Sequence, residues 1–158
     1  MKHGTRRNGA LLAAATALCA MTSPKPAESL TINRLGLFSE EADSGRIEEL
    51  EPYAVIPYRV GTSCYGWVLY FEPVDGTVEL DEILRLPAPA TEWNDDVGGS
   101  IIADDGQSAR THLEFEGQSG VATNAWCVAD GDPEGQYVFT LFFQRKQVGQ
   151  LPFRLRRE

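Results

Sequence analysis

The stretch CVADGDPEGQYVFTLFFQRKQVGQLPFRL, residues Cys127–Leu155, decides the fold class of this chain. Apolar side chains recur at every second position, which is the period of a half-buried β-strand, at Tyr137, Phe139, Leu141 and Phe143 and again at Leu151, Phe153 and Leu155. The polar link QRKQVGQ (144–150) separates the two runs, so together they predict a β-hairpin. Pro133-Glu134-Gly135 supplies a turn before it, because Pro presets φ and Gly permits positive φ.

Strand signals continue through the rest of the chain, with hardly any helical periodicity. We expect further strands within 30–38, 53–60, 63–73, 77–86 and 120–128, while 100–102 and 109–116 alternate only weakly. Pro57 predicts an edge or a bulge, while SCYGWVLYFEP (63–73) is apolar on both faces and predicts a central strand covered on both sides. The acidic segment 39–52 predicts an exposed excursion with one helical turn near Ile47–Leu50. Seven or eight strands at this spacing indicate an all-β fold, an immunoglobulin-like antiparallel β-sandwich.

The first residues have the composition of a secretory signal. A basic start, MKHGTRRNG, precedes the 12-residue apolar run ALLAAATALCAM and a small polar stretch, an order typical of a signal peptide and too short for a permanent membrane span. We expect a signal peptide at 1–20, a flexible mature N-terminus at 21–28 and a single sandwich domain at 29–157. Arg6-Arg7 leaves open export by the twin-arginine route instead of the general one. Either route predicts a periplasmic or secreted protein without an integral membrane segment.

Charge and cysteine content narrow the function classes. The 158 residues include 14 Lys and Arg and 23 Asp and Glu, a net charge of −9. Loss of Lys2, Arg6 and Arg7 with the signal leaves 11 basic residues, a net charge of −12, which argues against nucleic-acid binding. The two cysteines that remain, Cys64 and Cys127, predict a disulfide in an oxidising compartment. Both lie opposite the bulkier strand face, so we expect the bridge near strand ends; two free buried thiols are the alternative.

Four segments together resemble the bacterial exported proteins grouped as domain of unknown function 3859. They are GLFSEEA (36–42), IPYRVGTSCYGWVLYF (56–71), LPAPATEW (86–93) and DPEGQYVFTLFFQRKQVGQLPFRL (132–155). The order of these elements resembles that family over most of the mature chain, although LPAP stands where the family has a His-Pro-Pro-like element. The resemblance implies an immunoglobulin-like fold and export, and it implies no activity and no site residues.

The acidic turn before the hairpin is the first candidate for chemistry. Asp130, Asp132 and Glu134 stand at alternate positions, as at the start of a calcium loop. Such a loop needs a bidentate Glu at its twelfth position, where this chain has Leu141. We therefore expect a solvated turn, and Asp130, Asp132 and Glu134 are only weak metal candidates.

Catalytic patterns are sparse. His112 shares a polar strand face with Glu114 and Glu116 and has no companion nucleophile motif, so we expect an exposed histidine. Adjacent acidic pairs such as Asp81-Glu82 point to opposite strand faces, and we expect them to be solubilising charge. No phosphate loop, dinucleotide fingerprint or nucleophile elbow is present, which predicts a protein without a cofactor and not an enzyme.

Basic residues gather at the C-terminal end of the sequence. Candidates for contact with a partner are Trp93 in the loop at 87–100 and Arg145, Lys146, Arg154, Arg156 and Arg157. The basic residues alternatively guard an edge strand, together with Pro152. We expect a binding module of the bacterial envelope whose partner is another envelope protein. The alternatives are a carboxylate- or metal-dependent enzyme and a structural envelope component.

Overall fold

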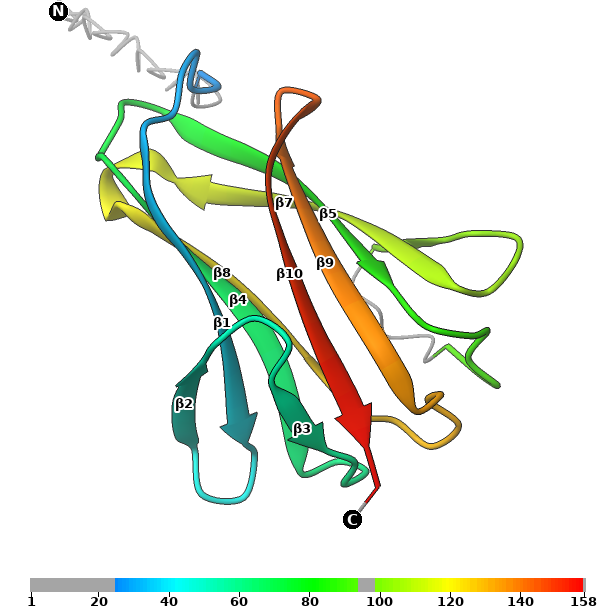
Figure 1. Cartoon of the computed structure of the whole chain (residues 1–158). Coiled ribbons are helices and arrows are strands. Elements are labelled where there is room, and N and C mark those ends of the chain that lie inside the picture. The colour runs from blue at the N-terminus through cyan, green and yellow to red at the C-terminus, as the bar shows by residue number, and fades with distance from the viewer. Residues whose placement is uncertain (1–24, 94–98, 158) are drawn as a thin grey trace, which may run out of the picture.

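The computed structural model describes residues 25–93 and 99–157, which form two facing β-sheets (Figure 1). The four-stranded sheet has the order β2-β1-β4-β8, with β1 Ile32–Glu41, β2 Arg46–Leu50, β4 Ser63–Phe71 and β8 Val121–Cys127. The six-stranded sheet has the order β3-β10-β9-β5-β7-β6, with β3 Val55–Pro57, β5 Thr77–Arg85, β6 Ile101–Ile102, β7 Ser108–Glu116, β9 Gly135–Phe143 and β10 Lys146–Arg156. The expected all-β sandwich is confirmed, with ten strands in place of seven or eight.

Nearly all neighbouring strands run antiparallel. The exception is β3, which lies parallel to the end of β10 at Arg154–Arg156. In the described part of the chain the only helical element is a 3-10 turn, Gly117–Ser119, and no helix there is long and apolar enough to cross a membrane. The predicted signal peptide and residues 21–24 lie outside the described residues.

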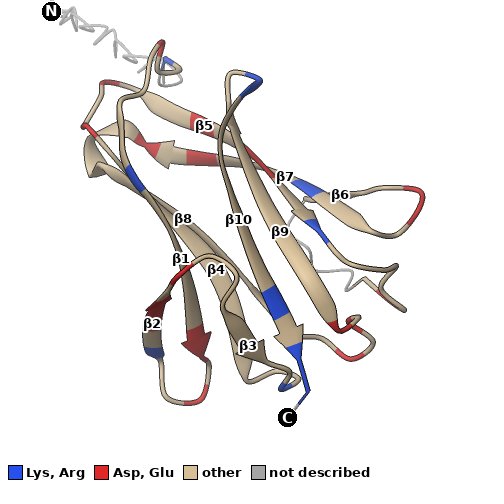
Figure 2. Cartoon of the chain, viewed as in Figure 1, with Lys and Arg blue, Asp and Glu red and all other residues tan. Residues whose placement is uncertain are grey.

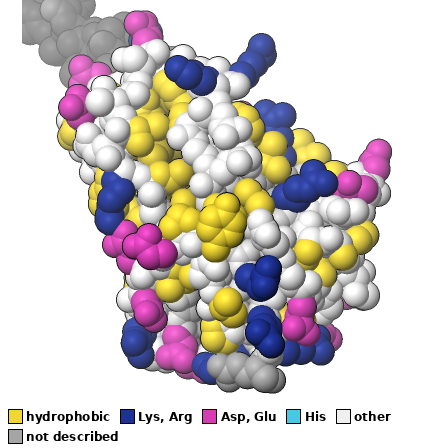
Figure 3. Space-filling model, in the orientation of Figure 1, with side chains coloured by type: hydrophobic (Ala, Val, Ile, Leu, Met, Phe, Trp, Pro, Cys, Tyr) yellow, Lys and Arg dark blue, Asp and Glu magenta, His cyan; other side chains and the backbone are white. Residues whose placement is uncertain are grey.

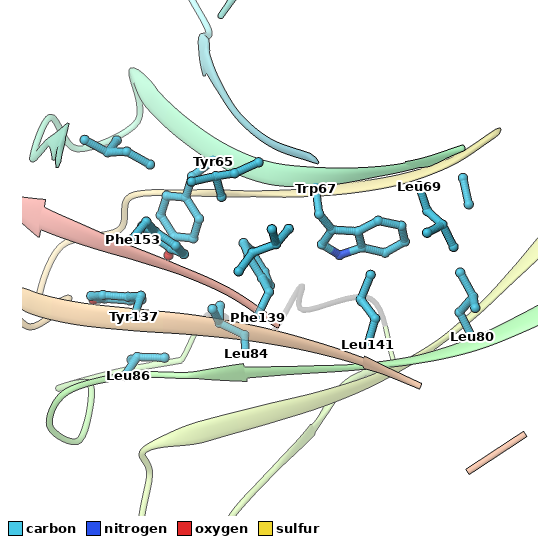
Figure 4. Close-up of a cluster of buried hydrophobic side chains, with 14 of the residues drawn as sticks. Tyr65, Trp67, Leu69, Leu80, Leu84, Leu86, Tyr137, Phe139, Leu141 and Phe153 are labelled. Carbon is cyan, nitrogen blue, oxygen red and sulfur yellow. The ribbon is translucent and has the colours of Figure 1, made fainter. Parts of the chain in front are cut away.

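Aromatic side chains fill the space between the sheets. Figure 4 shows Tyr65 and Trp67 of β4 reaching toward Tyr137 and Phe139 of β9 and Phe153 of β10. The Phe153 ring stacks on both Tyr137 and Phe139, at centroid distances of 5.3 and 5.5 Å. The alternation read from the sequence thus places one face of each hairpin strand in the core, where each buried large apolar side chain stabilises the fold by about 1.5–3 kcal/mol.

The C-terminal hairpin is tighter than the sequence indicates. The link at 144–150 shrinks to Gln144 and Arg145, whose φ angles of 50° and 67° are those of a two-residue hairpin turn. β10 therefore already begins at Lys146, with a register shift between Gln147 and Gly149. A Cβ at Gly149 would lie 2.3 Å from Leu35 Cδ2, so a larger residue at this position would have to displace the Leu35 side chain of β1.

The expected helical turn at Ile47–Leu50 is wrong, because this segment is strand β2. It pairs with Leu37–Glu41 of β1, and this ladder satisfies backbone groups that one helical turn would leave open. Ile47 is 65% exposed, which agrees with the missing apolar stripe. β2 is an outer strand of its sheet.

The expected central position of β4 is confirmed, since it lies between β1 and β8. Its inner face is buried, whereas its outer face is covered only in part. Phe38 of β1 lies over Gly66, where an added Cβ would lie 2.6 Å from the Phe38 ring. Farther along this face Tyr70 is exposed.

Residues before the first strand are also held in place. Pro26 forms a bridge with Thr77 at the start of β5, and the Ala27 N–H donates to the Thr77 carbonyl over 2.8 Å. Ala27 is buried. The folded part of the chain therefore begins within the segment 21–28, ahead of residue 29.

A disulfide joins Cys64 and Cys127. The two residues lie directly opposite each other on β4 and β8, at the start of one strand and the end of the other, as expected. The bridge therefore connects neighbours within one sheet and does not connect the two sheets. Cys64 is buried, and Cys127 is exposed to solvent.

We expect reduction to lower the thermal midpoint by roughly 15 °C, because a bridge between residues 63 positions apart contributes about 4 kcal/mol on the chain-entropy account. Thermal unfolding with and without a reductant measures this. The double variant Cys64→Ser/Cys127→Ser serves as the control, and its thermal midpoint should not change when the reductant is added. An unchanged midpoint of the native chain on reduction would contradict the expectation.

Candidate interaction surface

The basic residues of the C-terminal hairpin do not form one patch. Arg145 and Lys146 lie at the turn between β9 and β10, whereas Arg154 and Arg156 lie at the opposite end of β10 (Figure 2). Nine residues of extended chain separate Arg145 from Arg154, about 30 Å. The structure therefore divides the predicted contact residues into two groups.

Arg157 is occupied by its own chain. Its guanidinium lies over the Tyr58 ring, 4.5 Å from the centroid, and its Nε is 3.4 Å from Glu134 Oε1. Its backbone N–H donates to Glu134 Oε2 over 2.9 Å. These contacts fix the end of β10 against the acidic turn and leave Arg157 less available to a partner.

Strand register brings Arg85 close to Arg154, although they lie 69 positions apart in the sequence. Pro152 of β10 pairs with Val138 of β9, and Val138 pairs with Arg85 of β5. Arg85 and Arg154 thus lie two strands and two residues apart, about 12 Å between Cα atoms. Arg156 follows two positions later on β10 and points to the same side of the sheet.

In the described part of the chain these three arginines have no ion-pair partner. Within residues 25–93 and 99–157, Arg85, Arg154 and Arg156 make no hydrogen bond or ion pair through their side chains. All three are exposed. In a chain with a net charge of −9, three unpaired guanidiniums on one sheet face form a local positive region.

Apolar side chains lie between these arginines on the same outer face of the six-stranded sheet. Val138 and Pro152 separate Arg85 from Arg154, Ile83 precedes Arg85 on β5, and Val55 lies opposite Arg154 on β3. We call this surface, made of Arg85, Arg154, Arg156, Val55, Ile83, Val138 and Pro152, the arginine face. Figure 3 shows basic and hydrophobic side chains interspersed on the side of the molecule that carries β10.

The other half of this sheet face carries the carboxylate of Asp81, which lies beside two basic side chains. Asp81 of β5 accepts a hydrogen bond from Arg110 Nη2 over 3.0 Å, and its second oxygen lies 3.3 Å from His112 Nδ1. Burial opposes ionisation of this carboxyl, but the bonds from Arg110 and His112 outweigh it and hold the pKa of Asp81 below its usual range. His112 is exposed, as expected, and its nearest carboxylate belongs to Asp81 of the neighbouring strand, since Glu114 is 3.9 Å away.

The acidic turn is organised by the chain's own donors. The Ala129 N–H donates to Asp132 Oδ2 over 2.8 Å, Glu134 is bonded to Arg157, and Asp130 is exposed. Burial raises the pKa of Asp132, and the bond from Ala129 lowers it by less. Among the described residues no group of three or more His, Cys, Asp or Glu side chains is arranged to hold a metal ion.

We expect Asp132→Asn to make the protein more stable at neutral pH. Because the folded state raises the pKa of Asp132, its ionised form costs stability, and this cost disappears as the pH falls through the folded-state pKa. The Asn oxygen still accepts from Ala129 and carries no charge. Urea unfolding at pH 7.5 and pH 3.5 should show a gain that shrinks in acid; a less stable variant at pH 7.5 would show that the charge stabilises the turn.

Trp93 packs against the body of the protein. Its Nε1–H donates to the Gly106 carbonyl over 3.1 Å, and its ring meets that of Trp126 edge to face, with centroids 6.2 Å apart. The side chain is partly buried against the core. As a contact residue Trp93 would therefore present only part of its side chain.

The most unusual group in the core is Glu82, which is fully buried. Its Oε2 accepts from Trp67 Nε1 over 2.5 Å and from Asn124 Nδ2 over 2.8 Å, and its Oε1 accepts from Trp126 Nε1 over 2.6 Å. Glu82 comes from β5, while its three donors come from β4 and β8. This hydrogen-bonded group, which we call the Glu82 clamp, therefore ties the two sheets together.

The expectation that Glu82 is solubilising charge is wrong. The side chain follows the same alternation as Val78, Leu80 and Leu84, all of which point into the core. This alternation in the sequence could have predicted that Glu82 is buried. The adjacent Asp81 points toward solvent, as expected for the other face of the strand. Burial is possible because three N–H donors offset part of the cost of removing a carboxylate from water.

We expect Glu82→Leu to reduce the free energy of unfolding by about 3 kcal/mol or more, because the N–H groups of Trp67, Asn124 and Trp126 lose their acceptor inside the core. Urea unfolding measures the loss. Glu79→Gln, which changes an outward-facing carboxyl of the same strand, should shift stability by about 0.5 kcal/mol or less. Equal stability of the Glu82→Leu variant and the native chain would contradict a structural role for the clamp.

The comparisons with known proteins agree with this architecture. The sequence pattern of the family described as PM0630 beta sandwich domain matches residues 34–156. The fold is similar to that of an immunoglobulin-like protein, PA1606 of Pseudomonas aeruginosa, with a TM-score of 0.52 and 12% sequence identity over 81% of this chain and 97% of that one. No curated protein matches the chain. The expected immunoglobulin-like sandwich is thereby confirmed.

Proposed function

The chain belongs to the PM0630 beta sandwich domain family, and we propose that it is an exported binding module of the bacterial envelope. Its arginine face docks an acidic surface of a partner protein. The signal-like N-terminus supports export, and the resemblance to the exported family of domain of unknown function 3859 agrees with it as a prediction from the sequence.

The three unpaired arginines of the arginine face carry this proposal. Arginine is enriched among the residues that dominate protein–protein binding. On this face it surrounds apolar side chains, including Val138 and Pro152, which can be desolvated at the centre of an interface. A sheet face of this kind needs little rearrangement on docking. A partner with carboxylates spaced about 12 Å apart would match Arg85 and Arg154.

The surrounding charge favours a protein over a nucleic acid as the partner. The mature chain is expected to carry a net charge of −12, so a long phosphate backbone would be repelled on every side of a small positive face. A protein surface of limited size can contact the arginine face alone. Attraction at short range then also orients the partner.

Glu82 gives little support to the alternative of an enzyme. A catalytic carboxylate must reach substrate and exchange protons, whereas both oxygens of Glu82 accept hydrogen bonds from core side chains. Glu82 has no surface exposed to solvent. The Glu82 clamp is therefore better explained by stability than by chemistry.

Charge reversal tests the arginine face. We expect the variant Arg85→Glu/Arg154→Glu to lose about tenfold or more of the partner captured from crosslinked envelopes, because two attractive contacts become repulsive. Arg145→Glu/Lys146→Glu makes the same change in net charge at the far end of β10 and should capture as much as the native chain. Thermal midpoints verify that both variants fold.

The captured protein is then purified and its affinity measured directly. An acidic partner whose dissociation constant rises with salt would support the proposal. Equal capture by both variants would contradict it. Binding to vesicles of anionic lipid, lost in Arg85→Glu/Arg154→Glu, would replace the protein partner with a membrane surface.

A further inference from the structure

The outer strands of the two sheets are protected from pairing with other chains to different degrees. β2 carries Arg46, Glu48 and Glu49 along its five residues, β3 has only three residues and ends at Pro57, and β6 has two. Short length, charge and proline are the devices that keep sheet edges apart. Part of the edge of β10 is not covered by β3. There the segment before β3 protects it, because the Tyr53 N–H donates to the carbonyl of Pro152 over 2.6 Å.

β8 has none of these devices. It forms the remaining edge of the four-stranded sheet and spans seven residues, VATNAWC, without a charge, a proline or a glycine. Among residues 25–93 and 99–157 it has a strand neighbour on one side only, namely β4. An uncharged edge of this length is a template for a further strand.

The backbone direction along β8 follows from its ladder with β4. The Val128 N–H donates to the Ser63 carbonyl over 2.8 Å, and the Phe71 N–H donates to the Gly120 carbonyl over 3.0 Å. In an antiparallel pair such bonded positions alternate with positions that point away. The N–H and C=O groups of Thr123, Ala125 and Cys127 therefore all face the open edge.

The chain caps the outward-facing groups on both sides of this stretch. The Val121 N–H donates to Ser119 Oγ over 3.3 Å, and the same hydroxyl lies 2.8 Å from the Val121 carbonyl. At the other end the Ala129 N–H donates to Asp132, and the Ala129 carbonyl accepts from the Tyr58 hydroxyl over 3.1 Å. The backbone N–H and C=O groups of the three outward positions between these caps make no hydrogen bond with any described residue; the Thr123 hydroxyl donates to the Trp67 carbonyl on the side of β4.

We propose that β8 pairs with β8 of a second copy of this chain, antiparallel and about a two-fold axis at Ala125. Ala125 then exchanges two hydrogen bonds with Ala125 of the second copy. On one side of the axis Thr123 exchanges two with Cys127 of the second copy, and on the other side Cys127 exchanges two with its Thr123. All six open backbone groups of each copy are satisfied by this one register. The two four-stranded sheets become one continuous sheet of eight strands.

The uncharged composition of β8 favours a second copy over a foreign strand. Two-fold pairing about Ala125 places residue 125 directly opposite itself and keeps the rest of the strand beside an identical strand, so a charge at this position would meet a like charge. β8 has none, and the adjoining outer face of β4 presents Val68 and Tyr70. The chain as a whole has a net charge of −9, so two copies repel each other over most of their surfaces and approach most easily at an uncharged edge. The dimer edge lies on the opposite sheet from the arginine face, so this inference goes beyond the proposed function.

Residue 125 provides a specific test, because it faces itself across the axis. Sedimentation of the chain recovered from cells, from about 1 to 500 µM, should show a shift from monomer to dimer by mass action. We expect Ala125→Lys and Ala125→Glu each to weaken the dimer by about tenfold or more, since each places two like charges opposite one another. An equimolar mixture of the two variants should restore it. Gln150→Lys, on the outer face of β10, is the matched control and should dimerise as the native chain does.

Amide hydrogen exchange of the native chain gives a second readout that needs no variant. Exchange at Thr123, Ala125 and Cys127 should slow as the concentration rises. A monomer at every concentration would overturn the proposal, including the case in which a foreign strand occupies the edge. So would protection of these amides that is independent of concentration, or a dimer unaffected by both substitutions at residue 125.

Discussion

A carboxylate buried between the sheets is the interaction on which the other features of this sandwich depend. Glu82 enters the core from β5 and accepts N–H groups from two strands of the opposite sheet. Since these bonds are directional, they specify which residues of the two sheets face each other, which apolar contacts alone would leave less restricted. Trp67 is held in this way, and its ring meets Phe115 of β7 edge to face at 6.2 Å. The aromatic core on one side and the Trp93–Trp126 pair on the other both pack around this fixed point.

Alternating side chains made much of the fold predictable, because burial on one face of a strand leaves a period of two in the sequence. The C-terminal hairpin follows from this rule. The central position of β4 was predicted from apolar residues on both of its faces, and the edge position of β3 from Pro57. The pattern does not carry information about partners distant in sequence. β2 was expected to be partly helical, since its pairing with β1 leaves no pattern in its own sequence. The hairpin turn was expected to be longer because Lys146–Gln150 alternate poorly around a bulge.

Prediction of the site was less complete for the same reason. Arg154 and Arg156 were found as part of a run of basic residues, but Arg85 joins them only through the register of β10, β9 and β5. Arg157 was expected with them and is instead engaged by Glu134 and Tyr58. Glu82 stood in an apolar register and could have been recognised by its parity with Leu80 and Leu84. Its three donors, from strands that come before and after it in the sequence, could not.

The placement of the disulfide has a mechanical consequence. Cys64 and Cys127 join strands within one sheet and enclose everything between them, including β5, β6 and β7. If the chain were pulled from its two ends, force would pass from Cys64 directly to Cys127. The segments on either side, β1 to β3 and then β9 and β10, would extend, while the enclosed strands could lose their packing but would add nothing to the length. Under tension the oxidised protein is therefore a shorter tether than its sequence suggests, and reduction would release the enclosed loop as additional slack.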